Sequence, residues 1–266
     1  MSTYALGSQD PELARLEQQA EFLETPTRVL LSLCGITPGM RVLDLGSGLG
    51  HVARAVADLV GPEGEVVGLD ADERMVEEAT RRTDDPRVRF VTGDALSWRD
   101  GRPFDAVVGR LILFHLPDPA NVVRHHLDGV RPGGRVVVLD YDIGTIRSDP
   151  TEPLTTWLGA VLVEAFRRVG TDPTIGSRLQ GILADGGVSD VQGLGIEPYV
   201  AAGSPIGPAM LGGVIRTLAP AIVAHGLATA DELDVDKLPS RIAEALDASG
   251  SVLVPPALAG AWGRRA

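Results

Sequence analysis

The feature that most constrains this fold is an apolar strand that runs into a glycine-rich turn. Residues 41–50 read RVLDLGSGLG, so an apolar run is followed by Gly46, Gly48 and Gly50. Continuous apolar runs are typical of parallel strands that are covered on both faces. Glycines at alternate positions permit positive φ angles and let a ligand approach the backbone closely. The pattern predicts a strand over 41–46, a tight turn and a helix over 49–60.

An acidic residue closes the next predicted strand. Residues 65–70 read EVVGLD and predict a second buried strand that ends at Asp70. In nucleotide-binding βαβ units, an acid about 20 residues after the glycine turn binds ribose hydroxyls. The turn and Asp70 together predict a nucleoside-binding site.

Strand and helix patterns continue to alternate, with short connections, as far as residue 140. This alternation predicts an α/β fold with a Rossmann-like, mostly parallel sheet and helices on both of its faces. The further expected elements are strands at 87–92, 104–109 and 134–140 and helices at 72–82 and 119–130.

The flanking segments predict helices that form a cap and a lid. One or two amphipathic helices are expected over 11–33, and the later elements are helices at 152–169, 175–186, 205–224 and 230–247 and strands near 188–200 and 250–262. We expect one domain over 1–266. Its parts are a helical cap (1–35), a core with the predicted nucleoside-binding site (36–150), a helical region with a sixth strand (151–250) and a terminal strand (251–266).

The composition limits the possible partners. The net charge is −12 and Lys237 is the sole lysine, so the phosphate-neutralising patches that nucleic acids require are missing and basic partners are favoured over acidic ones. Cys34 is the only cysteine, which excludes a disulfide or a thiolate zinc site within one chain. No apolar run approaches the ~20 residues of a membrane helix, and the N-terminus lacks a secretory signal. We therefore expect a cytoplasmic monomer or homodimer without a membrane partner.

The order of the motifs resembles the class I S-adenosylmethionine-dependent methyltransferases, and within them the small-molecule branch of quinone-biosynthesis and natural-product enzymes. The resemblance covers about residues 4–142. It is carried by VLDLGSGLG, the acid at 70, GDA at 93–95, FDAVVGRLILFHLPDP at 104–119 and RPGGRVVVLD at 131–140. It implies a seven-stranded sheet with its antiparallel last strand in 251–262. It also implies S-adenosylmethionine as cofactor and S-adenosylhomocysteine as product.

The resemblance further implies a cofactor site made of backbone amides and acids. The amides of Gly46, Ser47 and Gly48 are expected to bind the cofactor's carboxylate at a helix start. Asp70 would bind the ribose, and Asp94 and the Ala95 amide would meet the adenine. Further expected contacts are Tyr4, Gln19, Ala71, Met75, Gly93 and Arg110. Each of these contacts has an alternative. Met75 could serve ordinary helix packing, Arg110 could form a surface salt bridge, and Tyr4 and Gln19 could cap helices.

One histidine follows the fourth predicted strand and is the candidate catalytic base. His115 is expected to titrate near neutral pH and to contact the acceptor, and a pocket-shaping role is its alternative. Tyr141 and Asp142 end the fifth strand, at the sheet edge where ligands bind. The remaining expected acceptor contacts are Trp157, Met210 and His225.

Other polar residues are given no role in the reaction. No metal is expected, since no amide-bearing ligand accompanies the acids at 140 and 142. His125 and His126 point in different directions on the helix expected over 119–130. They are predicted to lie on a partly exposed helix surface.

These features favour methyl transfer to oxygen or carbon of a small, largely apolar metabolite in natural-product biosynthesis. The GRLILF segment lacks the Asn-Pro-Pro-Tyr-like turn of enzymes that methylate planar amino groups. A cyclase or rearrangement enzyme that binds the same cofactor is the first alternative. A nicotinamide-dependent dehydrogenase is disfavoured, because Lys237 lies outside the sheet series and a catalytic Tyr-Lys pair is missing.

Overall fold

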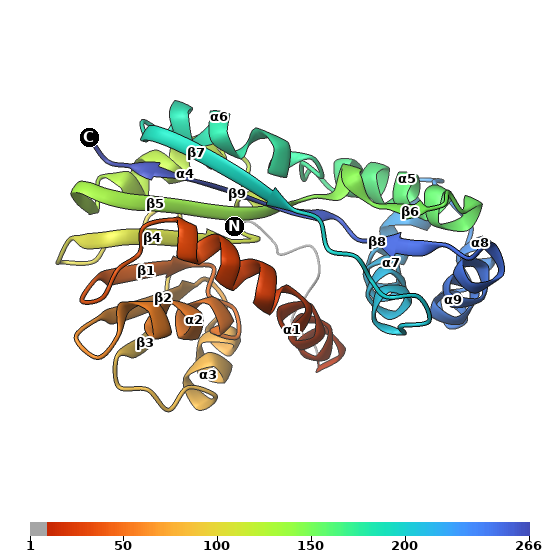
Figure 1. The fold of residues 1–266 in the computed structure, drawn as a ribbon, viewed down its shortest axis with the longest axis horizontal. Coiled ribbons are helices and arrows are strands. Elements are labelled where there is room, and N and C mark those ends of the chain that lie inside the picture. The colour runs from red at the N-terminus through yellow and green to blue at the C-terminus, as the bar shows by residue number, and fades with distance from the viewer. Residues whose placement is uncertain (1–9) are drawn as a thin grey trace. The chain divides into compact units, whose positions relative to one another are not determined.

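The computed structural model describes residues 10–266 (Figure 1). The chain divides into two compact units, each assembled from several segments. Among the described residues, the sheet unit comprises residues 20–140, 177–195 and 259–266, and the helical unit comprises residues 10–19, 141–176 and 196–258.

The sheet unit is built on a seven-stranded sheet of order β3-β2-β1-β4-β5-β9-β7. The strands β1 to β5 pair in parallel. The sheet therefore confirms the predicted mostly parallel, Rossmann-like fold. The strand bounds are β1 Arg41–Leu45, β2 Glu65–Asp70, β3 Val88–Thr92, β4 Phe104–Arg110, β5 Val130–Asp142, β7 Ser189–Ile196 and β9 Ala257–Arg264.

The strand order reverses between β1 and β4, and this reversal determines where a ligand can bind. After β1 the chain adds β2 and β3 on one side, then returns to add β4 and β5 on the other side. Neighbouring connections leave the sheet on opposite faces at such a point, which opens a crevice outside the carboxyl ends of the strands. The expected site therefore lies after Leu45 and Arg110.

The core of the sheet unit is formed by central strands that are apolar along their whole length. All five residues of β1 are buried. Leu43 stands beside Val67 of β2 and Val107 of β4, and each of these side chains is at most 2% exposed. Both faces of these strands are covered, which explains the continuous apolar runs in the sequence.

Helices that connect the strands begin where the sequence provides caps. Asp72 accepts a hydrogen bond from the N–H of Arg74 (2.9 Å), and Asp118 accepts one from the N–H of Asn121 (3.0 Å). Such caps satisfy backbone donors that the helix leaves unpaired. The helix bounds are α1 Asp10–Leu33, which spans both units, α2 His51–Val60, α3 Glu73–Arg81, α4 Pro119–Leu127 and α6 Leu179–Asp185, with short 3-10 helices η1 Leu113–His115 and η3 Ile175–Arg178.

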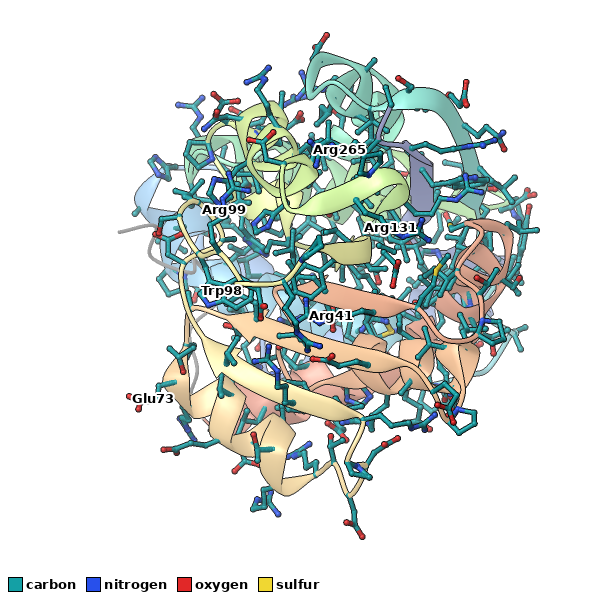
Figure 2. All side chains as sticks on the ribbon, turned by 90° about the vertical axis from the view of Figure 1, so that its left-hand side faces the viewer. Arg41, Glu73, Trp98, Arg99, Arg131 and Arg265 are labelled. Atoms are coloured by element: carbon teal, nitrogen blue, oxygen red, sulfur yellow. The ribbon has the colours of Figure 1, made fainter. Side chains whose placement is uncertain are left out.

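The amino-terminal edge of the sheet is held by an ion-pair network around Arg41 (Figure 2). Arg41 Nε lies 3.1 Å from Glu65 Oε2, and its Nη2 lies 3.0 Å from Asp100 Oδ2. Its guanidinium also stacks on the ring of Phe104, 4.1 Å from the centroid. These contacts stabilise the edge that lies opposite the expected site.

The helical unit combines longer helices with a small antiparallel sheet. Glu152 caps α5 by accepting hydrogen bonds from the N–H groups of Leu154 (2.8 Å) and Thr155 (2.7 Å). α7 packs against α5 and α9. The bounds are η2 Ile143–Thr145, β6 Arg147–Asp149, α5 Pro153–Arg168, α7 Ile206–Ala224, α8 Ala230–Leu233, α9 Leu238–Ser249 and β8 Val252–Val254, with β6 paired to β8.

Two expectations for the helical unit and the C-terminus were wrong in detail, and one strand was not predicted. The helix expected over 230–247 is split into α8 and α9 at Asp234, whose backbone is left-handed (φ +39°). The strand expected over 250–262 is two strands that belong to different sheets, β8 and β9, since Pro255 and Pro256 cannot donate ladder hydrogen bonds. The short strand β6 was not predicted.

The expectation about membrane-length apolar runs was also wrong. α7 has 19 residues, and an 18-residue window within it has a mean hydropathy of 1.5. By length and composition alone this helix could cross a membrane, although a core helix of a soluble protein meets the same criteria. Of the residues in this window, 39% are buried within the structure.

Candidate functional site

The glycine turn after β1 adopts the conformation that its sequence predicts. Gly46 and Gly48 have φ angles of +66° and +47°. A Cβ atom on Gly46 would lie 2.8 Å from Cδ1 of Ile112, so this glycine allows close packing. A Cβ on Gly48 would meet nothing within 4 Å. The backbone of Gly48 is therefore open to close approach by a ligand.

Asp70 lies directly against this turn. Its Oδ2 accepts a hydrogen bond from the N–H of Gly48 (2.8 Å), and its Oδ1 accepts one from the N–H of Asp72 (3.0 Å). Burial raises the pKa of the Asp70 carboxyl above its ordinary value, while the N–H groups of Asp72 and Gly48 act to lower it. The acid and the turn, which are 22 residues apart in the sequence, thus form one structure.

Two of the turn's amides already have acceptors within the chain. Ser47 donates to the carbonyl of Leu69 (3.0 Å), and Gly48 donates to Asp70. The expected contact of these amides with a ligand carboxylate stays a prediction. At the start of α2 no side chain caps the helix at Gly50, so the first turn of α2 carries the partial positive charge of a helix N-terminus.

A buried acid that sequence reasoning missed lies in β1 beside the turn. Asp44 is 1% exposed, and neither of its carboxylate oxygens receives a hydrogen bond of ordinary geometry from residues 10–266, although the N–H of Ala53 is near enough to lower its pKa. Burial raises the pKa of Asp44 to about 7, against the attraction of Arg110, which lowers it, and the repulsion of Asp70, which raises it further. The signal was present, since a charged residue in a buried apolar strand needs a partner.

Arg110 ends β4 and is tied to helix α1. Its Nη1 donates a hydrogen bond to Oγ1 of Thr27 at 3.0 Å, and Thr27 is buried. Arg110 also interacts electrostatically with Asp44. The expected contact of Arg110 with a ligand stays a prediction.

The segment after β3 joins the same edge of the sheet. The N–H of Gly93 donates to the carbonyl of Asp70 (2.8 Å). The N–H of Leu96 donates to Oδ1 of Asp94 (2.8 Å), and Nε2 of His126 lies 2.7 Å from the carbonyl oxygen of Ala95. The glycine turn, Asp70 and residues 93–95 are thus brought together at the carboxyl ends of β1, β2 and β3.

His126 corrects the expectation of a partly exposed histidine surface. It is 3% exposed, and burial is the main cause that lowers its pKa to about 4. His125, its neighbour in α4, hydrogen-bonds through Nε2 with the carbonyl oxygen of Trp98 (3.0 Å). Both rings therefore contact the backbone that follows β3.

His115 lies in η1, in the connection that follows β4. The ring is half-buried and meets the ring of Phe114 edge-on, with 4.9 Å between the centroids. The N–H of Phe114 donates to Oδ2 of Asp140 at 3.1 Å, and Asp140 is 1% exposed. The buried carboxylate of Asp140 therefore holds the loop that carries His115.

The other expected site residues occupy varied positions. Met75 in α3 is buried, Ala71 is exposed just after Asp70, and Gln19 in α1 is half-buried. In the helical unit Tyr141 is buried, Asp142 accepts a hydrogen bond from the N–H of Gly144 (3.2 Å), Trp157 and Met210 are half-buried and His225 is exposed. Tyr4 lies outside the described residues. Contact of these residues with a ligand stays a prediction.

A family model described as a methyltransferase domain matches residues 36–187. The match covers more than half of the chain. This chain belongs to the methyltransferase-domain family. The matched range contains the glycine turn, Asp70, the segment after β3 and the loop of His115, and it confirms the resemblance to class I S-adenosylmethionine-dependent methyltransferases.

Curated methyltransferases resemble part of the chain. The ubiquinone/menaquinone biosynthesis C-methyltransferase of Ectopseudomonas mendocina is 35% identical over 133 residues, which are 48% of this chain and 49% of that protein. A trans-aconitate 2-methyltransferase of Rhizobium leguminosarum is 34% identical over 113 residues, 42% of this chain and 43% of that protein. The chain thus spans half or less of the length of these relatives.

Solved structures agree with the methyltransferase fold over most of the chain. The YcgJ protein of Bacillus subtilis superimposes with a TM-score of 0.57 and 20% identity, over 91% of this chain and 99% of that one. Phosphoethanolamine N-methyltransferase 2 of Haemonchus contortus, solved with S-adenosyl-L-methionine, has a TM-score of 0.55 and 19% identity, over 90% of this chain and 52% of that one. At these identities the likeness shows the fold.

Proposed function

We propose that this methyltransferase-domain protein binds S-adenosylmethionine and transfers its methyl group to oxygen or carbon of a small, largely apolar metabolite. The observation that carries the proposal is the 2.8 Å hydrogen bond between the N–H of Gly48 and Oδ2 of Asp70. It joins the glycine turn after β1 to the acid that ends β2, next to the point where the strand order reverses. The family match and the methyltransferase relatives support the same conclusion.

The residues of the site fit the chemical groups of this cofactor. S-adenosylmethionine carries an ammonium, a carboxylate, a ribose and an adenine, but no pyrophosphate. Asp44 offers buried carboxylate oxygens that receive no hydrogen bond of ordinary geometry within the described part of the chain, and a cationic group would satisfy them. The open backbone at Gly48 provides room beside Asp70, whose remaining lone pairs can accept from ribose hydroxyls.

The chain's own residues would hold the ends of the cofactor in separate places. Asp44 would attract the ammonium group, and the first turn of α2 would attract the carboxylate. Asp70 would bind the ribose, while Asp94 and the amide of Ala95 would bind the adenine. When bound, the cofactor supplies an electrophilic methyl group on its sulfonium. The protein contributes alignment and exclusion of water, and alignment alone can provide about 7 to 11 kcal/mol in well-oriented systems.

We assign to His115 the role of general base toward a hydroxyl acceptor. Histidine can accept a proton near neutral pH, which raises the reactive fraction of a phenol whose pKa is about 10. The loop that carries His115 is held through Phe114 by the buried Asp140. A fixed loop would keep the base in one orientation. The alternative is that the imidazole only shapes the pocket, and the kinetics of His115→Ala distinguish the two roles.

The acceptor is proposed to be a small organic molecule. One relative is named for a small organic acceptor, trans-aconitate, and another is named as a C-methyltransferase of ubiquinone and menaquinone biosynthesis. The net charge of −12 and the single lysine disfavour a nucleic-acid substrate. The resemblance to the small-molecule branch supports a role in natural-product biosynthesis in the cytoplasm, and Tyr141, Asp142, Trp157, Met210 and His225 are the proposed acceptor contacts.

Calorimetry followed by a transfer assay tests this proposal. The purified chain should bind S-adenosylhomocysteine and should not bind NAD. The Asp70→Ala variant should bind S-adenosylhomocysteine more weakly. Incubation with methyl-labelled cofactor and a panel of phenols, quinones and polyketides should then transfer label to one class of acceptor. A product that forms without label would indicate a cyclase or rearrangement enzyme. Absence of S-adenosylhomocysteine binding would refute the proposed function.

A further inference from the structure

The last turn of helix α4 holds the segment that follows β3. We call residues 93–99 the adenine loop, because Asp94 and Ala95 within it are the proposed contacts of the adenine ring. The loop begins beside Asp70, where the N–H of Gly93 donates to the Asp70 carbonyl. Nε2 of His126, 31 residues further along the chain, reaches back to the Ala95 carbonyl.

One peptide group connects His126 to the Asp94 carboxylate. The carbonyl oxygen of the Ala95–Leu96 peptide lies 2.7 Å from Nε2 of His126. The N–H of the same peptide donates to Oδ1 of Asp94 at 2.8 Å. Because a peptide group is planar, fixing its carbonyl also fixes the direction of its N–H. The orientation of the Asp94 carboxylate is thereby coupled to the imidazole of His126.

The protonation state of His126 follows from its surroundings. A carbonyl oxygen only accepts, so Nε2 must carry the hydrogen and donate it. Burial lowers the pKa of His126 to about 4, so the ring is neutral at physiological pH. His126 is 3% exposed and its one N–H serves the loop, so solvent does not compete for the contact.

Neighbouring residues hold the far end of the loop to the same helix. Nε2 of His125 lies 3.0 Å from the carbonyl oxygen of Trp98. Arg99 donates to the carbonyl oxygen of His125, and its Nη2 lies 3.5 Å from Oδ2 of Asp128 (Figure 2). The loop is therefore tied to the end of α4 at Ala95, Trp98 and Arg99.

One oxygen of the Asp94 carboxylate is not used by the hydrogen bonds of the loop. Its side chain is exposed, Oδ1 is engaged with the N–H of Leu96, and Oδ2 receives no hydrogen bond from residues 10–266. The exocyclic amino group of adenine donates, and its ring nitrogen N1 accepts. Hypoxanthine reverses both roles, since it carries a carbonyl and a protonated N1. An aligned acceptor at Asp94 and donor at Ala95 would therefore discriminate between these two bases.

We propose that His126 is a positioning residue for base recognition, which holds the Ala95–Leu96 peptide so that Asp94 accepts from the amino group of adenine. This inference rests on the proposed function and names the residue that sets the base specificity of its cofactor site. His126 itself touches the loop and not the ligand.

Calorimetry with two ligands tests the role of His126. The probes are S-adenosylhomocysteine and S-inosylhomocysteine, which differ only in the base. We expect the wild-type chain to prefer the adenosyl ligand. His126→Phe keeps a ring but loses the donor, and should bind the adenosyl ligand about threefold to tenfold more weakly with little change for the inosyl ligand. His126→Gln can donate from its Nε2 and should restore the preference.

A matched control distinguishes positioning from general loosening of α4. Val122 is 1% exposed and lies one turn before His126 on the same helix. Val122→Ala should lower the melting temperature without changing the ratio of the two affinities. An unchanged ratio in His126→Phe, or an equal fall in Val122→Ala, would overturn the inference.

A further variant covers the case in which His126→Phe does not fold. The amide nitrogen of His126→Asn falls short of the Ala95 carbonyl, so this variant should show the same loss of preference. Retention of the wild-type preference in His126→Asn would also overturn the inference. Failure of the wild-type chain to bind S-adenosylhomocysteine would instead refute the proposed function, so the two failures are distinguishable.

Discussion

The buried acid in β1 should make the ligand-free protein less stable at neutral pH than it would be with a neutral side chain. Asp44 is 1% exposed and receives no hydrogen bond of ordinary geometry from the described residues. The charged groups that act on it are Arg110, Asp70 and Arg54. Replacement by asparagine keeps the size of the side chain and removes its ionisation. Asp44→Asn should therefore be more stable than the wild-type chain.

The size of the effect follows from the shift in pKa. The pKa of Asp44 rises from the ordinary value of 3.8 to about 7 in the folded chain. The folded state binds the proton more tightly than the unfolded state. Protonation of Asp44 therefore stabilises the fold fully below about pH 4, and this stabilisation is lost as the pH rises to about 7. Each pKa unit corresponds to about 1.4 kcal/mol. The free energy of unfolding is therefore lower by about 4 kcal/mol at pH 8 and by about 2 kcal/mol at pH 5 than it is with Asp44 protonated.

Urea denaturation of both chains measures this difference. We expect Asp44→Asn to gain about 2 to 4 kcal/mol in the free energy of unfolding at pH 8, because asparagine still buries a polar group, and to gain less at pH 5. Asp247→Asn is the control, since that acid is exposed in α9 and should show no such dependence. A gain at pH 8 no larger than at pH 5, or a loss of stability at pH 8, would refute the reasoning.

The same substitution should weaken ligand binding. If Asp44 receives the cofactor's ammonium group, Asp44→Asn should lose about 1.5 to 3 kcal/mol of S-adenosylhomocysteine affinity, the range for charged hydrogen bonds. Greater stability with weaker binding is the usual relation where a strained polar group serves a ligand. Calorimetry at pH 8 measures the loss, and undiminished affinity would remove Asp44 from the ligand site.

Three further predictions concern other residues of the site. Asp70→Ala should weaken S-adenosylhomocysteine binding by about 1.5 to 3 kcal/mol in calorimetry, and unchanged binding would exclude Asp70 from the ribose contact. His115→Ala should lower kcat in the transfer assay more than it lowers cofactor affinity, whereas equal losses would support a pocket-shaping role. Burial, with smaller contributions from His125 and Arg99, lowers the pKa of His126 from 6.5 to about 4, so its contribution to stability is complete above about pH 6.5 and is lost as the pH falls toward 4. Urea denaturation should show that His126→Gln removes about 3 kcal/mol of this acid sensitivity, and an unchanged pH profile would contradict the assignment.

The sequence alone determined the local units that form the candidate site. The apolar run of β1, its glycine turn and the acid at the end of β2 predicted a strand, a turn and Asp70 in that order, and the structure brings Gly48 and Asp70 to 2.8 Å. Such predictions succeed because a strand covered on both faces must be apolar and a tight turn needs glycine. The order of these units is enough to predict a parallel sheet, since each crossover must return to the sheet with the same hand.

Only the tertiary structure decided which polar residues are buried and what they contact. His126 looked like a surface residue, but it is packed against a carbonyl 31 positions earlier in the sequence. Arg110 meets Thr27 across 83 positions, and the run after Ser249 divides between two sheets. Periodicity reports which face of an element is apolar, but burial and hydrogen-bond partners depend on elements that are distant in the sequence. The environments of Asp44 and His126, and hence their pKa values, therefore exist only in the folded chain.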